Sequence, residues 1–149
     1  MFFRTTKVFR GRALQLDNEL LELLKYHHDR AVEILEVAKE LFKNGKFKDA
    51  NNRSYYAAYY AMRAVYTLQG KDFKKHKTLL AEFNKEFVAS EIFPRTIGRK
   101  ISMLALIREQ SDYNDFYIAS SAESQQQVEI AEELIELVAE YLKKQGIEF

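Results

Sequence analysis

One stretch of the 149-residue chain decides the fold: residues 52–68 read NRSYYAAYYAMRAVYTL. Apolar and aromatic side chains follow one another here with almost no polar stripe between them, and no glycine or proline interrupts the run. A helix that is apolar nearly all round is usually buried at the centre of a bundle. We therefore predict a central helix that begins near Phe47 and ends at Gly70.

Apolar residues recur at helical spacing on both sides of this segment. This pattern predicts a first helix over residues 17–42, a third over about 79–88 and a fourth that begins at Phe93-Pro94. The period then fails between residues 111 and 120. Ser120, followed three residues later by Glu123, is the signature of a capping box and predicts the start of a fifth helix.

The composition favours a single all-α domain. The chain is 47% hydrophobic and 30% charged and has one proline and five glycines, too few breakers for a β-sandwich. We expect an up-and-down antiparallel bundle of about five helices over residues 17–149, preceded by a flexible basic arm over residues 1–16. Cysteine, a signal peptide and a membrane-spanning run are absent from the sequence, which favours a cytoplasmic protein that does not contact a membrane.

Several kinds of active site are disfavoured by the residues present. The three histidines, His27, His28 and His76, have no second ligand at a spacing that would close a metal site. The sequence also has no glycine-rich phosphate loop and no nucleophile elbow. We therefore expect no bound metal and no cofactor.

Arginine and tyrosine carry the remaining signal. Arg53, Tyr56 and Tyr60 share one face of the central helix, with Arg53 and Tyr60 about 10 Å apart along its axis. Such a face suits a phosphate or a stacked base, because guanidinium offers a planar fork of donors. The alternative is that the tyrosines are core residues and that Arg53 pairs with a carboxylate. A second stripe favours packing, in the core or at a self-association surface: Tyr55, Tyr59, Met62 and Tyr66.

A second polar cluster stands where the fourth helix is expected to end. Arg108 and Asp112 are spaced for an ordinary i,i+4 ion pair, and with Tyr113 and Asp115 they are also candidates for a polar cleft. His76 lies among lysines, where it forms either a basic lip for an anionic partner or a solvated helix start.

The chain resembles the HEPN domain family, in its branch of small stand-alone prokaryotic proteins. The motifs that carry the resemblance span roughly residues 25–145 and are Asn52 to Ala61, Gly70, His76-Lys77, Glu86-Phe87, Phe93-Pro94 and Asp112 to Phe116. The resemblance implies an up-and-down helical bundle that forms a homodimer. It also implies a pairing with a minimal nucleotidyltransferase in a toxin–antitoxin system, in which the HEPN member is a metal-independent ribonuclease.

The nuclease members of that family carry an arginine with a histidine shortly after it. Here the histidine position falls on Tyr113 when counted from Arg108, and on Tyr60 when counted from Arg53. Tyrosine is a poor base at neutral pH, so we predict a module that binds a nucleotide, RNA or a protein partner without cleavage. Two alternatives stay open: a ribonuclease toxin that uses His76 or Tyr113, and an oligomerisation scaffold built on the tyrosine stripe and the acidic fifth helix.

Overall fold

The computed structural model describes residues 18–149, so the predicted basic arm at residues 1–16 lies outside the described residues. The elements, in chain order, are α2 (Asn18–Lys43), α3 (Phe47–Leu68), α4 (His76–Phe83), the π-helical turn η1 (Asn84–Val88), α5 (Arg95–Tyr113) and α6 (Ser121–Lys144). No strand occurs in this part of the chain. The predicted all-α bundle of about five helices is confirmed.

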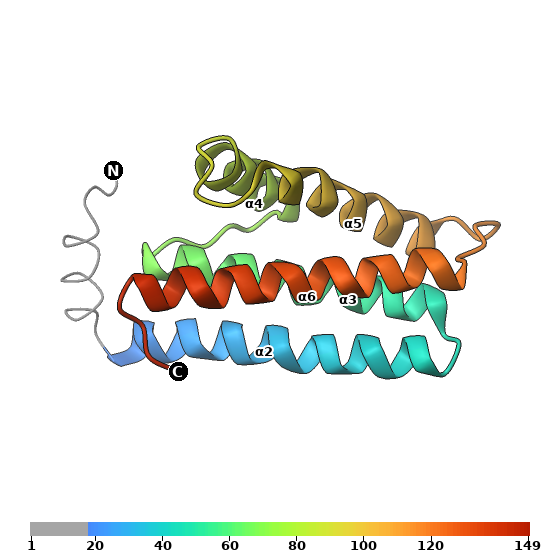
Figure 1. Cartoon of the computed structure of the whole chain (residues 1–149), viewed down its shortest axis with the longest axis horizontal. Helices are drawn as coiled ribbons and strands as arrows, with labels where there is room; N and C mark the ends of the chain where they lie inside the picture. Colours follow the sequence, from blue (N-terminus) through green and yellow to red (C-terminus); the bar gives the residue numbers. More distant parts are fainter. Residues whose placement is uncertain (1–17) are drawn as a thin grey trace.

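The long helices alternate in direction (Figure 1). α2 and α3 form an antiparallel pair, α5 runs back beside α3, and α6 returns across the bundle in front of α3. α4 and η1 lie within the connection between α3 and α5. α3 packs against α2, α5 and α6, which makes it the central helix that its apolar sequence predicts.

Local sequence signals set two of the helix ends. α2 is followed by Gly45, whose φ of 76° is readily adopted only without a Cβ. At the start of α6, the Ser120 hydroxyl accepts a hydrogen bond from the backbone N–H of Glu123 at 3.1 Å. The Glu123 carboxylate accepts a hydrogen bond from the Tyr117 hydroxyl. Half of the predicted capping box is therefore present, and the Glu123 side chain fastens the preceding loop.

The second tyrosine stripe of α3 lies inside the bundle. Its members are between 0% and 6% exposed: Tyr55, Tyr59, Met62 and Tyr66. Of the two roles open to this stripe, packing is correct and a self-association surface is wrong, because the rings are covered by the chain's own helices.

Two element boundaries differ from the prediction. The third helix becomes a π-helical turn after Phe83, and α5 continues to Tyr113 although the apolar period fails at Ser111. Ser111 is buried and its hydroxyl accepts a hydrogen bond from the Asn51 amide at 3.1 Å, so α5 packs on α3 through polar groups there. Gly98 permits close contact between α5 and η1, since a Cβ at this position would lie 2.8 Å from the Val88 Cγ1.

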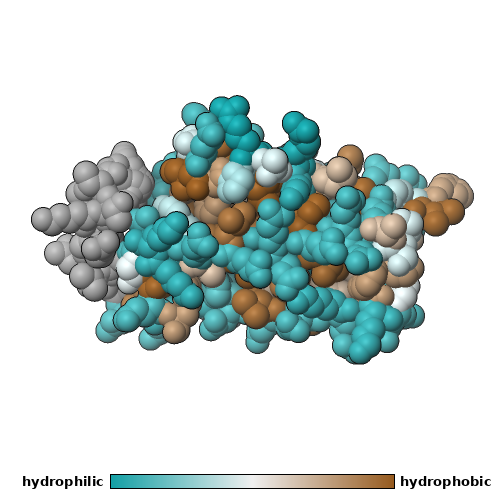
Figure 2. Space-filling model, in the orientation of Figure 1, coloured by the Kyte–Doolittle hydropathy of each residue, from teal (hydrophilic) through white to brown (hydrophobic). Residues whose placement is uncertain are grey.

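The face of the molecule seen in Figure 2 is mostly hydrophilic. Apolar side chains gather at the end where the α5–α6 loop turns, and there Phe116 is 94% exposed and Ile118 is 88% exposed. None of the described helices combines the length and the apolar character that a bilayer-crossing segment needs.

Candidate functional site

Arg108, near the end of α5, lies over two tyrosine rings of α3. Its guanidinium carbon is 4.6 Å from the ring centroid of Tyr55 and 5.6 Å from that of Tyr56. Both distances fall within the range of a cation–π contact. The Arg108 side chain is only 14% exposed, and its Nε is buried without a hydrogen-bond acceptor in the described part of the chain. The site therefore holds a partly desolvated cation with a spare donor.

A small polar network fixes the end of α5 against α3. The Asp112 carboxylate lies 3.6 Å from the Arg108 Nη1 and accepts a hydrogen bond from the Asn52 amide at 2.9 Å. One carboxylate thus serves both helices. It neutralises Arg108 only in part, because the pair is long and is not the bidentate arrangement that makes arginine–carboxylate pairs strong.

Arg53 adds a second cation on the same ring. Its guanidinium carbon is 5.1 Å from the Tyr56 centroid, and its Nε donates a hydrogen bond to the Asn52 side-chain oxygen at 2.8 Å. Tyr56 therefore has two arginines within cation–π distance, one from α3 and one from α5. With Asp112 as the acid paired to them, the cluster keeps one excess positive charge, which suits an anionic ligand.

His76, the first residue of α4, closes the site from a third helix. Its ring packs on Tyr59 with centroids 4.1 Å apart, and its Nδ1 is 3.3 Å from the Tyr55 hydroxyl. Burial lowers the pKa of His76, and the positive charges of Arg108 and Arg63 lower it further. Burial raises the pKa of Tyr55 to about 12. At neutral pH the site therefore contains a neutral imidazole beside a protonated phenol.

Comparison with known proteins agrees with this arrangement. The sequence matches the HEPN domain over residues 24–142, which is most of the chain. The chain belongs to the HEPN domain family. It is 36% identical over 98 residues to a UPF0332 protein of Thermotoga maritima, covering 66% of this chain and 74% of that protein. It is 30% identical over 98 residues to the "Putative toxin MJ0605" of Methanocaldococcus jannaschii, covering 66% of this chain and 73% of that protein.

In this HEPN protein, most of the residues singled out from the sequence lie together. Five of them surround Tyr55 and Tyr56, on α3, α4 and α5: Arg53, Tyr56, His76, Arg108 and Asp112. Tyr113 is 73% exposed at the rim, with its ring centroid 5.9 Å from the Arg108 guanidinium carbon. The cluster draws on three helices, so it depends on the folded bundle.

Two predicted residues lie apart from this cluster. Tyr60 is further along α3, where its ring centroid is 5.9 Å from that of His27 and 5.3 Å from the Arg63 guanidinium carbon. Asp115 is exposed in the turn after α5 and has no hydrogen bond or ion pair to any residue from 18 to 149. Asp115 therefore does not line a cleft with Arg108 and Tyr113 in this structure.

Sequence analysis missed Asn52, Tyr55 and Arg63 as site residues. Tyr55 was assigned to packing because of its spacing, and it does pack, but its ring and hydroxyl also contact Arg108 and His76. Arg63 follows Arg53, Tyr56 and Tyr60 at the next helical interval, so the same spacing that identified those three would have identified it.

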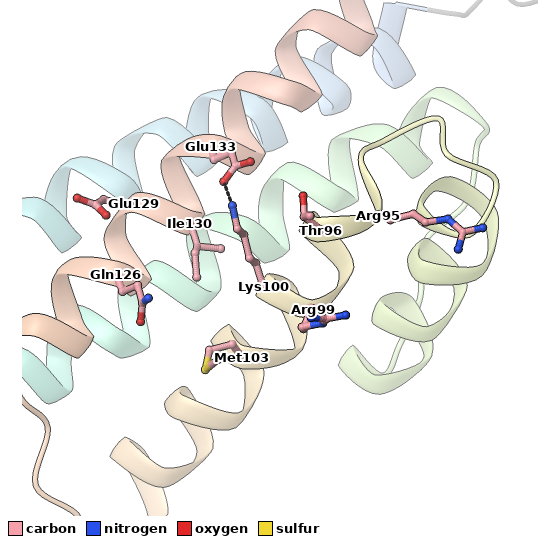
Figure 3. A pocket seen from close by; sticks show the side chains of 9 residues that line it. All are labelled: Arg95, Thr96, Arg99, Lys100, Met103, Gln126, Glu129, Ile130 and Glu133. Carbon is pink, nitrogen blue, oxygen red and sulfur yellow. Dashed lines mark hydrogen bonds and ion pairs between the residues drawn. The ribbon is translucent and has the colours of Figure 1, made fainter.

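A groove of about 530 Å³ lies elsewhere, between α5 and α6 (Figure 3). Its lining includes Arg99, Lys100 and Glu133, and Lys100 donates a hydrogen bond to the Glu133 carboxylate at 2.8 Å. None of the residues around Tyr56 lines it. We assign the functional site to the arginine and tyrosine cluster, because that cluster has unneutralised charge and a spare buried donor.

Proposed function

We propose that this HEPN protein binds RNA, with Arg53 and Arg108 on the phosphates and Tyr56 as a stacking surface. The observation that carries the proposal is the pair of guanidinium groups on one tyrosine ring, with Asp112 as their partial counter-charge. Phosphate accepts bidentate hydrogen bonds from arginine, and an aromatic ring stacks on any base. The relative named as a putative toxin is consistent with this class of ligand.

Binding of a labelled single-stranded RNA, followed by fluorescence anisotropy, tests the proposal. Arg108→Gln and Arg53→Gln should each weaken binding by about tenfold, the loss of one charge-assisted contact. The melting temperature should stay within about 4 °C of wild type, because a lone ion pair contributes little to stability. Equal loss of fold and binding would return both arginines to a structural role.

Arg95→Gln is the matched control. Arg95 is also on α5 and also forms an i,i+4 ion pair at 3.6 Å, with Glu91, but it lies at the other end of the helix. Its substitution removes the same charge and should leave RNA binding nearly unchanged. If Arg95→Gln and Arg108→Gln weaken binding equally, the effect is one of net charge and the proposed site is wrong.

A second candidate function, metal-independent RNA cleavage, is favoured by His76. When its Nδ1 carries the ring proton and donates to the Tyr55 oxygen, Nε2 is left as a proton acceptor. Nε2 would take the proton of the 2′-hydroxyl as that oxygen attacks phosphorus, and the exposed Tyr113 hydroxyl would protonate the departing 5′-oxygen. The products are a 2′,3′-cyclic phosphate and a free 5′-hydroxyl.

Incubation with a structured RNA in the presence of a chelator separates the two functions. Cleavage that disappears in His76→Ala, with RNA binding retained, would make the protein a ribonuclease. Intact RNA under the same conditions, with Arg108-dependent binding, would leave a binding module.

The partner of such a module, we infer, is a nucleotidyltransferase in a toxin–antitoxin pair, with the HEPN protein as a homodimer. This inference rests on what membership of the family implies and on the relative named as a toxin. Light scattering of the purified chain tests the dimer. Co-purification with the product of an adjacent nucleotidyltransferase gene tests the pair, and its failure to bind would overturn it.

A further inference from the structure

Arg63 continues the face of α3 that carries Arg53, Tyr56 and Tyr60. Its guanidinium carbon lies 5.8 Å from the ring centroid of Tyr59 and 5.3 Å from that of Tyr60. Arg63 thus stands on tyrosine rings as Arg108 and Arg53 do, but two helical turns beyond Tyr55. Eight residues of α-helix correspond to about 12 Å along the axis.

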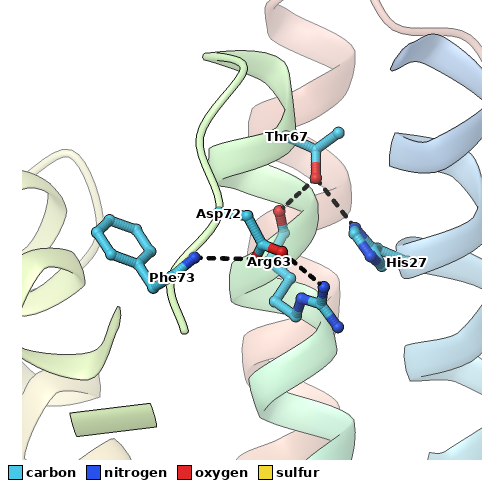
Figure 4. A network of polar contacts seen from close by, with 5 residues as sticks. All are labelled: His27, Arg63, Thr67, Asp72 and Phe73. Carbon is cyan, nitrogen blue, oxygen red and sulfur yellow. Dashed lines mark hydrogen bonds and ion pairs between the residues drawn. The ribbon is translucent and has the colours of Figure 1, made fainter. Parts of the chain in front are cut away.

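An acidic side chain from the α3–α4 loop occupies this second cation. The Arg63 Nη2 donates a hydrogen bond to the Asp72 carboxylate at 3.0 Å (Figure 4). Arg63 is 21% exposed, whereas Asp72 is 62% exposed. The Arg63 Nε is buried and has no acceptor among the described residues. The pair therefore leaves a donor of Arg63 unused, and its acid faces solvent.

His76 stands between the two cationic positions. On one side it contacts Tyr55, whose ring Arg108 covers, and on the other it packs on Tyr59, whose ring Arg63 approaches. Both arginines act on the same imidazole, since each lowers the pKa of His76. The two positions therefore belong to one continuous surface along α3.

We propose that Arg63 is a second phosphate-binding position, for a phosphate further along the RNA strand held by Arg53 and Arg108, and that Asp72 fills this position until RNA displaces it. This inference rests on the proposed function. A phosphate has the advantage over the carboxylate because it can accept from two guanidinium nitrogens at once, whereas Asp72 accepts from one. The lysines of the same loop add positive charge around the exchange: Lys71, Lys74 and Lys75.

The spacing makes the ligand's length diagnostic. At 3.4 Å per stacked nucleotide, about four nucleotides cover the 12 Å from Tyr55 to Arg63. Uridine monophosphate reaches one position only, while decauridine reaches both. Arg63→Gln should therefore weaken decauridine about fivefold, leave the monophosphate unchanged, and lower the slope of log Kd against log salt by about 0.7, the share of one phosphate on a single strand.

Asp72→Asn supplies the opposite change. Because it removes the internal competitor of the phosphate, decauridine should bind about threefold tighter. Glu140→Gln is its control, since Glu140 forms a comparably exposed ion pair with Lys144 within α6. If both acidic variants tighten binding equally, the gain comes from net charge and the role of Asp72 is overturned.

Arg63→Lys guards against a misfolded variant, because it keeps the charge but loses the fork of donors. It should fold as wild type by circular dichroism and lie between wild type and Arg63→Gln in affinity for decauridine. Folded Arg63 variants with wild-type affinity, alongside a weakened Arg108→Gln, would overturn this inference and leave the proposed function intact. Wild-type affinity in both Arg63→Gln and Arg108→Gln would overturn both.

Discussion

The two ends of α3 use the same residue type in different surroundings. Tyr66, near the C-terminal end, is fully buried, and its ring centroid is 4.9 Å from that of Phe73 and 5.6 Å from that of Phe87. Tyr55, near the N-terminal end, is 2% exposed, but its ring is covered by Arg108 and its hydroxyl contacts His76. Burial and residue type are nearly the same, so the neighbouring side chains decide what each ring does.

The two hydroxyl groups show the same contrast. Tyr66 donates to the Glu86 carboxylate at 2.9 Å, and burial together with this acid raises its pKa far above the ordinary value. Burial also raises the pKa of Tyr55, but Arg108 opposes the change. A tyrosine among phenylalanines and an acid stabilises the core, whereas one beside a cation and an imidazole belongs to a site for anions.

The largest expected effect is at the phenylalanine end. Phe83 is fully buried and stacks on Phe87 and Phe93, with centroids 5.2 Å and 5.3 Å apart. Phe83→Ala should lower the free energy of unfolding by about 3–5 kcal/mol, because it removes buried apolar area and leaves a cavity. Urea denaturation measures the loss. A loss below about 1 kcal/mol would mean that this end is not the more rigid part of the core.

The histidines of the two regions supply the second test. His27 is 3% exposed, and its Nδ1 lies 3.0 Å from the Thr67 hydroxyl, which itself donates to the Arg63 backbone carbonyl. Because the only hydroxyl proton of Thr67 is used there, the His27 Nδ1 must carry a proton and donate. Burial, aided by the charge of Arg63, lowers the pKa of His27 to about 4.

A lowered histidine pKa makes stability depend on pH. The stabilising effect of neutral His27 is fully present above the unfolded-state pKa of about 6.5 and is lost as the pH falls from there towards 4. The full loss is up to about 3 kcal/mol. Urea denaturation at pH 7.5 and 4.5 should show a clearly smaller pH effect in His27→Gln than in wild type. The same pH effect in both proteins would contradict this assignment.

Much of the fold could be predicted because its signals are local. Apolar spacing indicated the helices, and Gly45 and Ser120 marked two of their boundaries. The π-helical turn was missed because it depends on contact between η1 and α5 at Gly98, which are distant in the sequence. The continuation of α5 past Ser111 was missed for the same reason, since Asn51 of α3 satisfies that serine.

The candidate site was predictable only in part. Helical spacing grouped Arg53 with Tyr56, and Arg108 with Asp112, but it could not show that the two groups meet. The position of His76 depends on how the α3–α4 loop returns α4 to the middle of α3, and no local pattern encodes that path. For the same reason the Arg63–Asp72 pair, which bridges a helix and the loop after it, could not be read from spacing.

The smallest expected effect gives the finest comparison of the two ends. Tyr55→Phe and Tyr66→Phe each remove one hydroxyl and should each cost about 1 kcal/mol of unfolding free energy. Only Tyr55→Phe removes the partner of the His76 Nδ1, so only that variant should change the balance of His76 tautomers. Nitrogen chemical shifts of ¹⁵N-labelled His76 report this balance directly. An equal change in Tyr66→Phe would show that the two ends of α3 are coupled through the bundle, and the distinction between core and site would then be one of degree.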